Sequence, residues 1–472
     1  MSKLLKIGYL LFLLLLLFMA VEAYKYRGNV SFDPEEIVKK SILKDKTFET
    51  NVVEIVSENG IKAYLFEDHT IPIISIDFLF KNSGISYDEA GYEGIGNMVS
   101  ALLTEGAGDL DNDKLKEELE LYAIGISFGV DFDDFKGSLL TLSENKEKAY
   151  NLLNLALTKP RFDDENAALA KQRMNFALRM QSERPDSVLG LEFAKNIYGR
   201  HPYSRNPVGQ KQAIAKITRK DMQNYIKENL TTDKLVVGIS GDITPDEAGK
   251  VLDKIFQGLK KEGLNKEISA ADIVFDGRDV EIKRKSAQNI AIFANRALER
   301  TDTDFYPLYV VNYIFGEAGL GSRLSLKARE EEGLTYGIYT SIVNRQKSDM
   351  LRGRFSATPE NYYRVIEIVK NEWKNMGSKG ITEAELKSAK DYLIASYNLR
   401  FASIDNISSM LTYMQRYNLG IDFLQKRNEY VRNITLEQAN GAAEKYFNDD
   451  NLIFISIGNF NREISGENDN GK

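Results

Sequence analysis

The sequence of 472 residues contains no cysteine and only two histidines, His69 and His201. Without cysteine, the chain cannot form a disulfide, a zinc ribbon, an iron–sulfur cluster or a thiol nucleophile. Chemistry that depends on imidazole has to use one of two residues that lie far apart in the sequence. They occur in the loop-like stretches "EDHTIP" and "GRHPY" with no partner at metal-ligand spacing, so we interpret both as ordinary loop residues.

A cluster of positive charge is also missing. The 62 lysines and arginines are outnumbered by 69 aspartates and glutamates, which gives a net charge of −7 at pH 7. No basic block offers a surface that could follow a phosphate backbone, and this argues against nucleic-acid binding. The remaining composition, 43% hydrophobic and 28% charged, is ordinary for a soluble globular protein.

The N-terminus carries a targeting signal. A basic start, "MSKLLK", precedes the apolar run "IGYLLFLLLLLFMAV" and then "VEA", whose small residues suit a cut after Ala23. The apolar run is shorter than the roughly 20 residues that a membrane-spanning helix needs. We therefore predict a cleaved signal peptide at residues 1–23 and a periplasmic location, which fits the lack of cysteine, with an uncleaved N-terminal membrane anchor as the alternative.

Strand and helix patterns alternate after a polar lead-in at residues 24–46. "NVVEIVSENGIKAYLFED" predicts two strands around an Asn59–Gly60 turn, and "IPIISIDFLF" predicts a buried strand. Helical periodicity begins at Gly94. This alternation is typical of an α+β fold.

The same unit occurs twice along the chain. "ITRKDMQNYIKENLTTDKLVVGISGDI", from Ile217, aligns without a gap with "ITLEQANGAAEKYFNDDNLIFISIGNF", from Ile434. In each copy a threonine begins a helix, and an apolar strand ends at a glycine. Two long helices precede both copies. We predict an N-terminal half at residues 47–257, a charged linker at 258–279, a C-terminal half at 280–461 and a disordered tail at 462–472.

One short helix has an unusual polar face. In "EGIGNMVSALLTEGAGDL", the apolar positions Ile95, Met98, Val99 and Leu102 have core spacing. Asn97, Ser100 and Ala101 share the opposite face. In an HxxEH zinc motif these three positions hold, in this order, a histidine, the glutamate and the second histidine.

The chain resembles the pitrilysin/insulinase family of zinc metallopeptidases, in particular its bacterial and mitochondrial processing peptidase-like members. The resemblance covers nearly all of the chain after the signal. It rests on "VSENGIKAYLFEDHTIPIISIDFLFKNSG", the "SALLTEGAG" helix and turn, "GRHPYSRNPVGQ", "ISGDI" and "GLGSRLSLKAREEEGLTYGIYT". It implies an α+β fold of the LuxS/processing-peptidase type, with two homologous halves. Each half is expected to be a pair of α/β sandwich units in which helices cover an antiparallel sheet.

The sequence departs from this family at the metal site. Asn97-Met98-Val99-Ser100-Ala101 stands where the family has HxxEH, and the family's third zinc ligand falls near Ala177, with no glutamate between Glu165 and Glu183. We therefore expect this chain to bind no cofactor, to hold no catalytic residue by itself and to be inactive alone.

The second half keeps a different part of the family's site. In "AREEEGLTYG", Arg329 and Tyr336 flank Gly333. In the family this spacing marks an arginine and a tyrosine that bind the substrate backbone and the oxyanion. Alone, Arg329 could equally form a surface salt bridge with the following glutamates, and Tyr336 could simply pack in a strand. The glycine-rich "GEAGLGSRL" just upstream resembles the family's substrate-recognition loop and favours the substrate-binding interpretation.

This combination implies half of an active site. We expect a non-catalytic, substrate-binding subunit of a periplasmic heterodimeric peptidase, whose partners are a peptide substrate and an HxxEH-bearing subunit of the same family that holds the zinc. The alternative is an inactive homologue that acts as a scaffold or a peptide-holding protein.

Overall fold

The computed structural model describes residues 51–447 and 451–460. The predicted signal peptide, the lead-in and the tail at 462–472 lie outside these residues. Within the described ranges, no helix is both long enough and apolar enough to cross a membrane.

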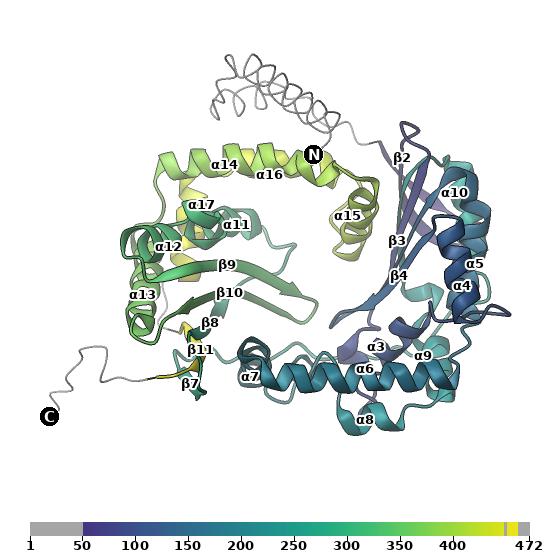
Figure 1. The fold of residues 1–472 in the computed structure, drawn as a ribbon. Coiled ribbons are helices and arrows are strands. Elements are labelled where there is room, and N and C mark those ends of the chain that lie inside the picture. The colour runs from purple at the N-terminus through teal and green to yellow at the C-terminus, as the bar shows by residue number, and fades with distance from the viewer. Residues whose placement is uncertain (1–50, 448–450, 461–472) are drawn as a thin grey trace, which may run out of the picture. The chain divides into compact units, whose positions relative to one another are not determined.

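The first half is built on a six-stranded sheet with the strand order β1-β2-β6-β3-β5-β4 (Figure 1). Neighbouring strands are antiparallel except for β2 and β6, which run parallel. The predicted β1–β2 hairpin turns at Gly60, whose φ of 82° suits glycine. The strands are β1 (Val52–Val56), β2 (Lys62–Glu67), β3 (Ile73–Phe80), β4 (Gly125–Val130), β5 (Phe135–Leu142) and β6 (Leu235–Gly241).

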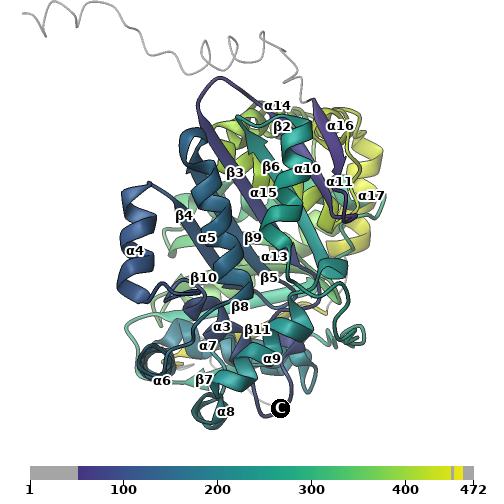
Figure 2. The same cartoon turned by 90° about the vertical axis from the view of Figure 1, so that its right-hand side faces the viewer.

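Helices cover one face of this sheet (Figure 2). Two of them, α5 (Lys146–Thr158) and α10 (Pro245–Phe256), pack against each other and against the strands, and their apolar sides join the core. The other helices of this half are α3 (Ile95–Leu102), α4 (Asn112–Leu121), α6 (Asp164–Glu183), α7 (Pro185–Tyr198), α8 (Lys211–Lys216) and α9 (Arg219–Asn229).

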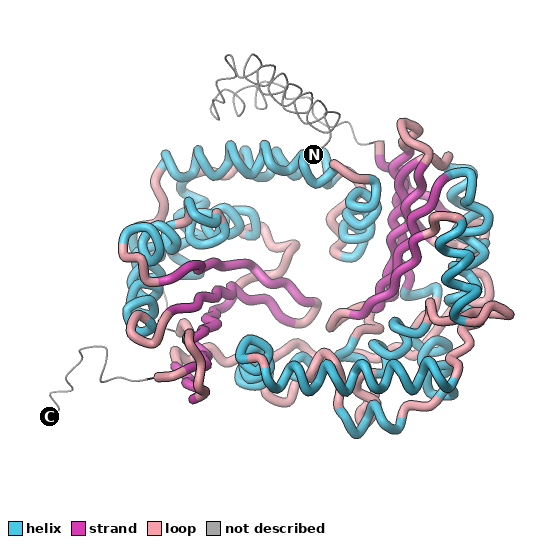
Figure 3. The backbone as a smooth tube through the Cα atoms, in the orientation of Figure 1, coloured by secondary structure: helices cyan, strands magenta, loops and turns pink. Residues whose placement is uncertain are grey.

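The second half repeats the plan with five strands in the order β7-β11-β8-β10-β9. This is the order of the first sheet without β1, and the parallel pair is again the one formed by the last strand, β11 with β7. Figure 3 shows the strands of both halves in magenta and the helices beside them in cyan. The strands are β7 (Asp279–Lys283), β8 (Asn289–Arg296), β9 (Thr335–Arg345), β10 (Ser348–Ala357) and β11 (Ile453–Gly458). The helices are α11 (Phe305–Asn312), α12 (Arg323–Ser325), α13 (Tyr362–Lys379), α14 (Glu383–Tyr397), α15 (Ile404–Arg416), α16 (Phe423–Arg432) and α17 (Leu436–Phe447).

Local structure explains why the sequence repeat is visible. The Thr218 side chain accepts a hydrogen bond from the Asp221 N–H at the start of α9, and Thr435 caps α17 through Gln438 in the same way. The fold class of two homologous α+β halves is therefore confirmed. Within the described residues each half contains one sheet, where we expected a pair of sandwich units per half.

Each half lends one helix to the sheet of the other half. The helix α7 packs on β8 and β11 of the second sheet, while α15 packs on β6, β3 and β2 of the first. The two helices occupy equivalent places in the repeat. A Cβ at Gly238 in β6 would overlap the Ser408 carbonyl oxygen of α15, so glycine permits the close approach. The sequence pattern did not predict this exchange.

Candidate functional site

The helix α3 is held by its apolar stripe and by an acid at its N-terminus. Met98, Val99 and Leu102 are buried in the first core. The Gly94 N–H donates to Asp88 Oδ2 over 2.8 Å, which satisfies one of the free amides at the start of the helix. Burial raises the pKa of Asp88 to about 7.

The polar face of α3 makes structural hydrogen bonds. The Asn97 side-chain amide donates to the Pro207 carbonyl, and Ser100 Oγ donates to the Asn97 carbonyl over 2.9 Å, while Ala101 is exposed. Ala177 lies on α6, which packs against α3. These four side chains offer no imidazole, no carboxylate and no thiolate, so they do not fit zinc. The described part of the chain contains no group of three or more His, Cys, Asp or Glu that could hold a metal ion.

Both histidines have defined partners away from α3. His69 lies between two carboxylates, with Nδ1 at 2.6 Å from Asp242 and Nε2 at 2.8 Å from Glu67. The hydrogen bond to Asp242, and to a smaller extent the one to Glu67, raises the pKa of His69. In His201, Nδ1 accepts the Tyr203 N–H and so caps the short turn that follows.

Arg329 and Tyr336 come together at the start of β9. Arg329 lies in the π-helical segment Leu326–Glu331, and the chain reverses at Gly333, whose φ is 64°. Arg329 Nη1 then donates to the Tyr336 carbonyl over 3.0 Å. The structure thus places the two predicted site residues in direct contact, through the backbone of Tyr336.

The glutamates that follow Arg329 have mostly other partners. Glu331 pairs with Lys327 and Glu332 pairs with Arg364. Only Glu330 approaches Arg329, at 3.4 Å from Nε. A pair with exposed partners on both sides contributes at most about 1 kcal/mol, so it leaves the guanidinium available to a ligand.

A β-bulge presents Tyr336 to solvent. In the β9–β10 pair, Gly337 is opposite Ser356 and Thr335 is opposite Ala357, so Tyr336 is the extra residue. Tyr336 is 82% exposed, which argues against the alternative of strand packing.

Thr335 supports the bulge and was missed by sequence reasoning. Its hydroxyl donates to the Ser356 carbonyl over 2.6 Å and accepts the Gly337 N–H over 3.1 Å. A β-branched hydroxyl residue directly before the tyrosine is the signal that could have indicated it. The supported bulge and the Arg329 contact together hold an exposed phenol and a guanidinium in one short segment, and both groups can donate hydrogen bonds.

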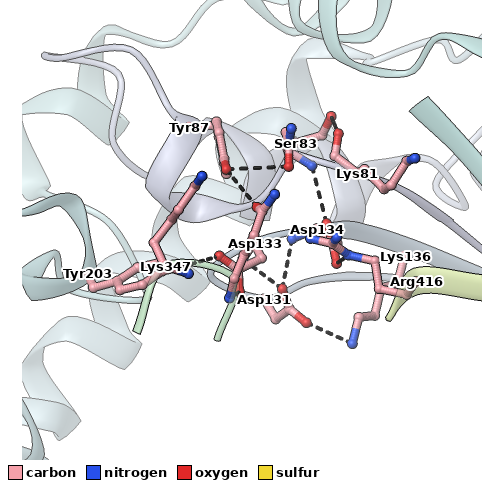
Figure 4. Close-up of polar contacts among 12 residues, drawn as sticks. Lys81, Ser83, Tyr87, Asp131, Asp133, Asp134, Lys136, Tyr203, Lys347 and Arg416 are labelled. Atoms are coloured by element: carbon pink, nitrogen blue, oxygen red, sulfur yellow. Dashed lines mark hydrogen bonds and ion pairs between the residues drawn. The ribbon is translucent and has the colours of Figure 1, made fainter. Parts of the chain in front are cut away.

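Polar contacts join the two halves at the other end of β9, at the β9–β10 turn (Figure 4). Asp133 accepts from the Tyr203 hydroxyl at 2.5 Å and from the Gln346 N–H at 3.1 Å, which fixes the β9–β10 turn to the first half. Asp134 Oδ2 lies 2.6 Å from Arg416 Nε at the end of α15. These bonds tie both halves at the turn after β4.

Comparison with known proteins identifies the kind of protein to which this chain is similar. Residues 216–393 match the family model described as the peptidase M16 inactive domain. The "Non-peptidase homolog YmxG" of Helicobacter pylori is 24% identical over 402 residues, which cover 83% of this chain and 90% of that protein.

Solved structures give the same result for the fold. The peptidase M16 inactive domain from Pseudomonas fluorescens superposes with a TM-score of 0.82 and 25% identity, over 87% of this chain and 98% of that one. The periplasmic protease PqqL from Escherichia coli superposes with a TM-score of 0.75 and 16% identity, over 87% of this chain and 46% of that one.

Proposed function

We propose that this chain, as an inactive member of the pitrilysin/insulinase (M16) peptidase family, is the non-catalytic, substrate-binding subunit of a heterodimeric periplasmic peptidase. One observation carries the proposal: α3 holds no metal ligand, yet Arg329 and Tyr336 remain paired and exposed at a supported bulge. The predicted signal peptide and the periplasmic protease with a similar fold favour the location.

In this proposal the chain contributes hydrogen-bond donors to a peptide held between two subunits. The Tyr336 hydroxyl and the Arg329 guanidinium donate to a peptide carbonyl, and they bind it more tightly as negative charge develops on its oxygen. A homologous subunit with an intact HxxEH helix supplies the metal and the attacking water. No step requires metal chemistry on this chain.

The test is reconstitution with an HxxEH-bearing homologue from the same organism. The purified chain alone should cleave no peptide and the mixture should cleave it, with metal analysis assigning the zinc to the partner. Arg329→Ala and Tyr336→Phe in this chain should each lower kcat by about 10²-fold, as loss of an oxyanion donor does. Tyr339→Phe, at an exposed tyrosine three residues further along β9, is the matched control and should keep full activity.

The second candidate function is a scaffold or peptide-holding protein without a part in cleavage. It is favoured by the similarity to a non-peptidase homologue. A pull-down separates the two functions, because only the first requires an HxxEH-bearing partner. Cleavage that is unchanged by both substitutions would reject the first function, and cleavage by the single chain would reject both.

A further inference from the structure

A cavity of about 200 Å³ lies between α7 and the second sheet. Its walls combine apolar side chains with guanidinium groups. Asn97 of α3 hydrogen-bonds the carbonyl of Pro207, which also lines the cavity, so the cavity adjoins the altered metal helix. Its lining includes Phe132, Leu191, Phe193, Met350, Arg345 and Arg352.

Two arginines reach this cavity from neighbouring strands. In the antiparallel register Ser341 is opposite Arg352 and Val343 is opposite Met350, so Arg345 of β9 and Arg352 of β10 lie on the same face of the sheet. The Arg345 guanidinium stacks on Phe132 at 3.9 Å from the ring centre. Its Nη1 is shielded from solvent and has no hydrogen-bond partner among the described residues.

Within residues 51–447 and 451–460, the two guanidinium groups have no acidic partner. The nearby Asp186 is paired with Arg354, and Asp133 is hydrogen-bonded by Tyr203 and Gln346. No carboxylate is among the residues that line the cavity. Burial, and then the charge of Arg345, lower the pKa of Arg352. Two like charges held together in a half-buried site raise the free energy of the folded chain unless an anion joins them.

A third arginine has a structural role. Arg205 Nη1 donates to the backbone carbonyls of Ile85, Ser86 and Asp88, the last at 2.7 Å. Its hydrogen bonds therefore brace the segment before α3. Among the arginines that line the cavity, Arg345 and Arg352 lack such backbone partners in the described part of the chain.

We propose that this cavity binds a carboxylate of a bound peptide, with Arg345 and Arg352 as the recognising pair. Guanidinium groups bind carboxylates through paired, charge-assisted hydrogen bonds, and the apolar wall accommodates the aliphatic stem that carries the acid. The volume suits one side chain rather than a drug-sized molecule, since such sites usually exceed about 300 Å³. This inference rests in part on the proposed peptide-binding function. It adds that the chain selects a peptide by an acidic residue or by its free C-terminus.

Direct binding to the isolated full chain tests this proposal. Fluorescence anisotropy would compare four peptides labelled at the N-terminus. They carry either Glu or Gln between leucines at the centre, and each is made with a free C-terminal carboxylate and with a C-terminal amide. We expect the peptide that has neither Glu nor a free C-terminus to bind at least about tenfold more weakly than one with the recognised carboxylate. The Glu amide and the Gln acid identify which carboxylate is bound. Equal affinity for all four peptides would overturn the proposal.

Variants assign the preference to the two arginines. Arg345→Gln and Arg352→Gln should each abolish the preference for a carboxylate. Arg296→Gln removes an exposed positive charge from the adjacent β8 and should preserve it. Retention of the preference in both cavity variants would overturn the proposal.

The melting temperature separates binding from a structural role. Arg352→Gln removes one of two like charges and should leave the melting temperature of the free chain unchanged or raise it, whereas loss of a structural arginine lowers it. Arg345→Gln also removes the stacking on Phe132, so its melting temperature should be the lower of the two. A lower melting temperature in both variants, with peptide affinity unchanged, would contradict the proposal. The assay uses neither partner nor metal, so it can succeed while reconstituted cleavage fails, and the reverse.

Discussion

The ion pair between Asp134 and Arg416 gives a quantitative test of how α15 is held on the first sheet. The side chains are 6% and 11% exposed, their atoms lie 2.6 Å apart, and Asp134 Oδ1 accepts the Asn82 N–H at 3.2 Å. Removal of one partner from a buried pair leaves an uncompensated charge and costs about 3–5 kcal/mol. Arg416→Gln should therefore destabilise the chain strongly at pH 8.

The cost should depend on pH in a defined direction. Burial raises the pKa of Asp134 to about 6, although Arg416 lowers it. The pKa of Asp134 in the folded chain lies above its unfolded value of about 3.9, so folding takes up a proton between these two pH values. The stabilisation that comes from this proton uptake is present below pH 4 and is lost as the pH rises through 6. Without Arg416 the folded pKa rises further, and Asp134 becomes neutral at mildly acidic pH.

Thermal and urea unfolding at pH 5 and pH 8, followed by circular dichroism, measure the effect. Arg416→Gln should lose several times more stability at pH 8 than at pH 5. The double variant Asp134→Asn/Arg416→Gln should be more stable at pH 8 than Arg416→Gln alone, because no charge is left buried. An equal loss at both pH values, or a double variant no better than the single one, would refute the reasoning.

Three further outcomes are expected. Because the pKa of Asp88 is raised to about 7, the wild-type chain should become less stable as the pH rises from 4 to 8. Asp88→Asn should flatten this pH dependence in unfolding curves and should be more stable than the wild type at pH 8. Gly238→Ala should cost about 1–3 kcal/mol in urea unfolding because its Cβ meets the backbone of α15, while Gly129→Ala, with open space around it, should be nearly neutral. Thr335→Val should remove two hydrogen bonds from the bulge and lower the free energy of unfolding by about 1–2 kcal/mol. It should also lower cleavage by the reconstituted complex as much as Tyr336→Phe does, and full cleavage by the valine variant would contradict a positioning role.

The sequence predicted the features that local chemistry determines. The Asn59–Gly60 turn, the start of α3 at Gly94 and the threonine caps at Thr218 and Thr435 each depend on residues within one or two turns of chain. These features were sufficient to reveal the repeat and the fold class.

Long-range packing explains what the sequence could not predict. The buried positions of α7 and α15 show that a face of each helix is covered, but not that the covering sheet belongs to the other half. The neighbouring positions of Arg345 and Arg352 follow from the β9–β10 register, and the exposure of Tyr336 follows from a bulge at the second residue of β9. Each of these depends on which strands pair, which periodicity alone does not specify.

The site residues connect these observations to a single physical interpretation. In α3 the polar face has become a structural contact, since Asn97 ties the helix to the Pro207 carbonyl. Pro207 also lines the cavity in which Arg345 and Arg352 place two like charges, and Arg345 Nη1 has no hydrogen-bond partner among the described residues. Like charges held together without a counterion cost stability, and costs of this kind cluster at ligand-binding sites. Both features support the proposal that the region beside α3 holds a ligand and that residues of another chain act on it.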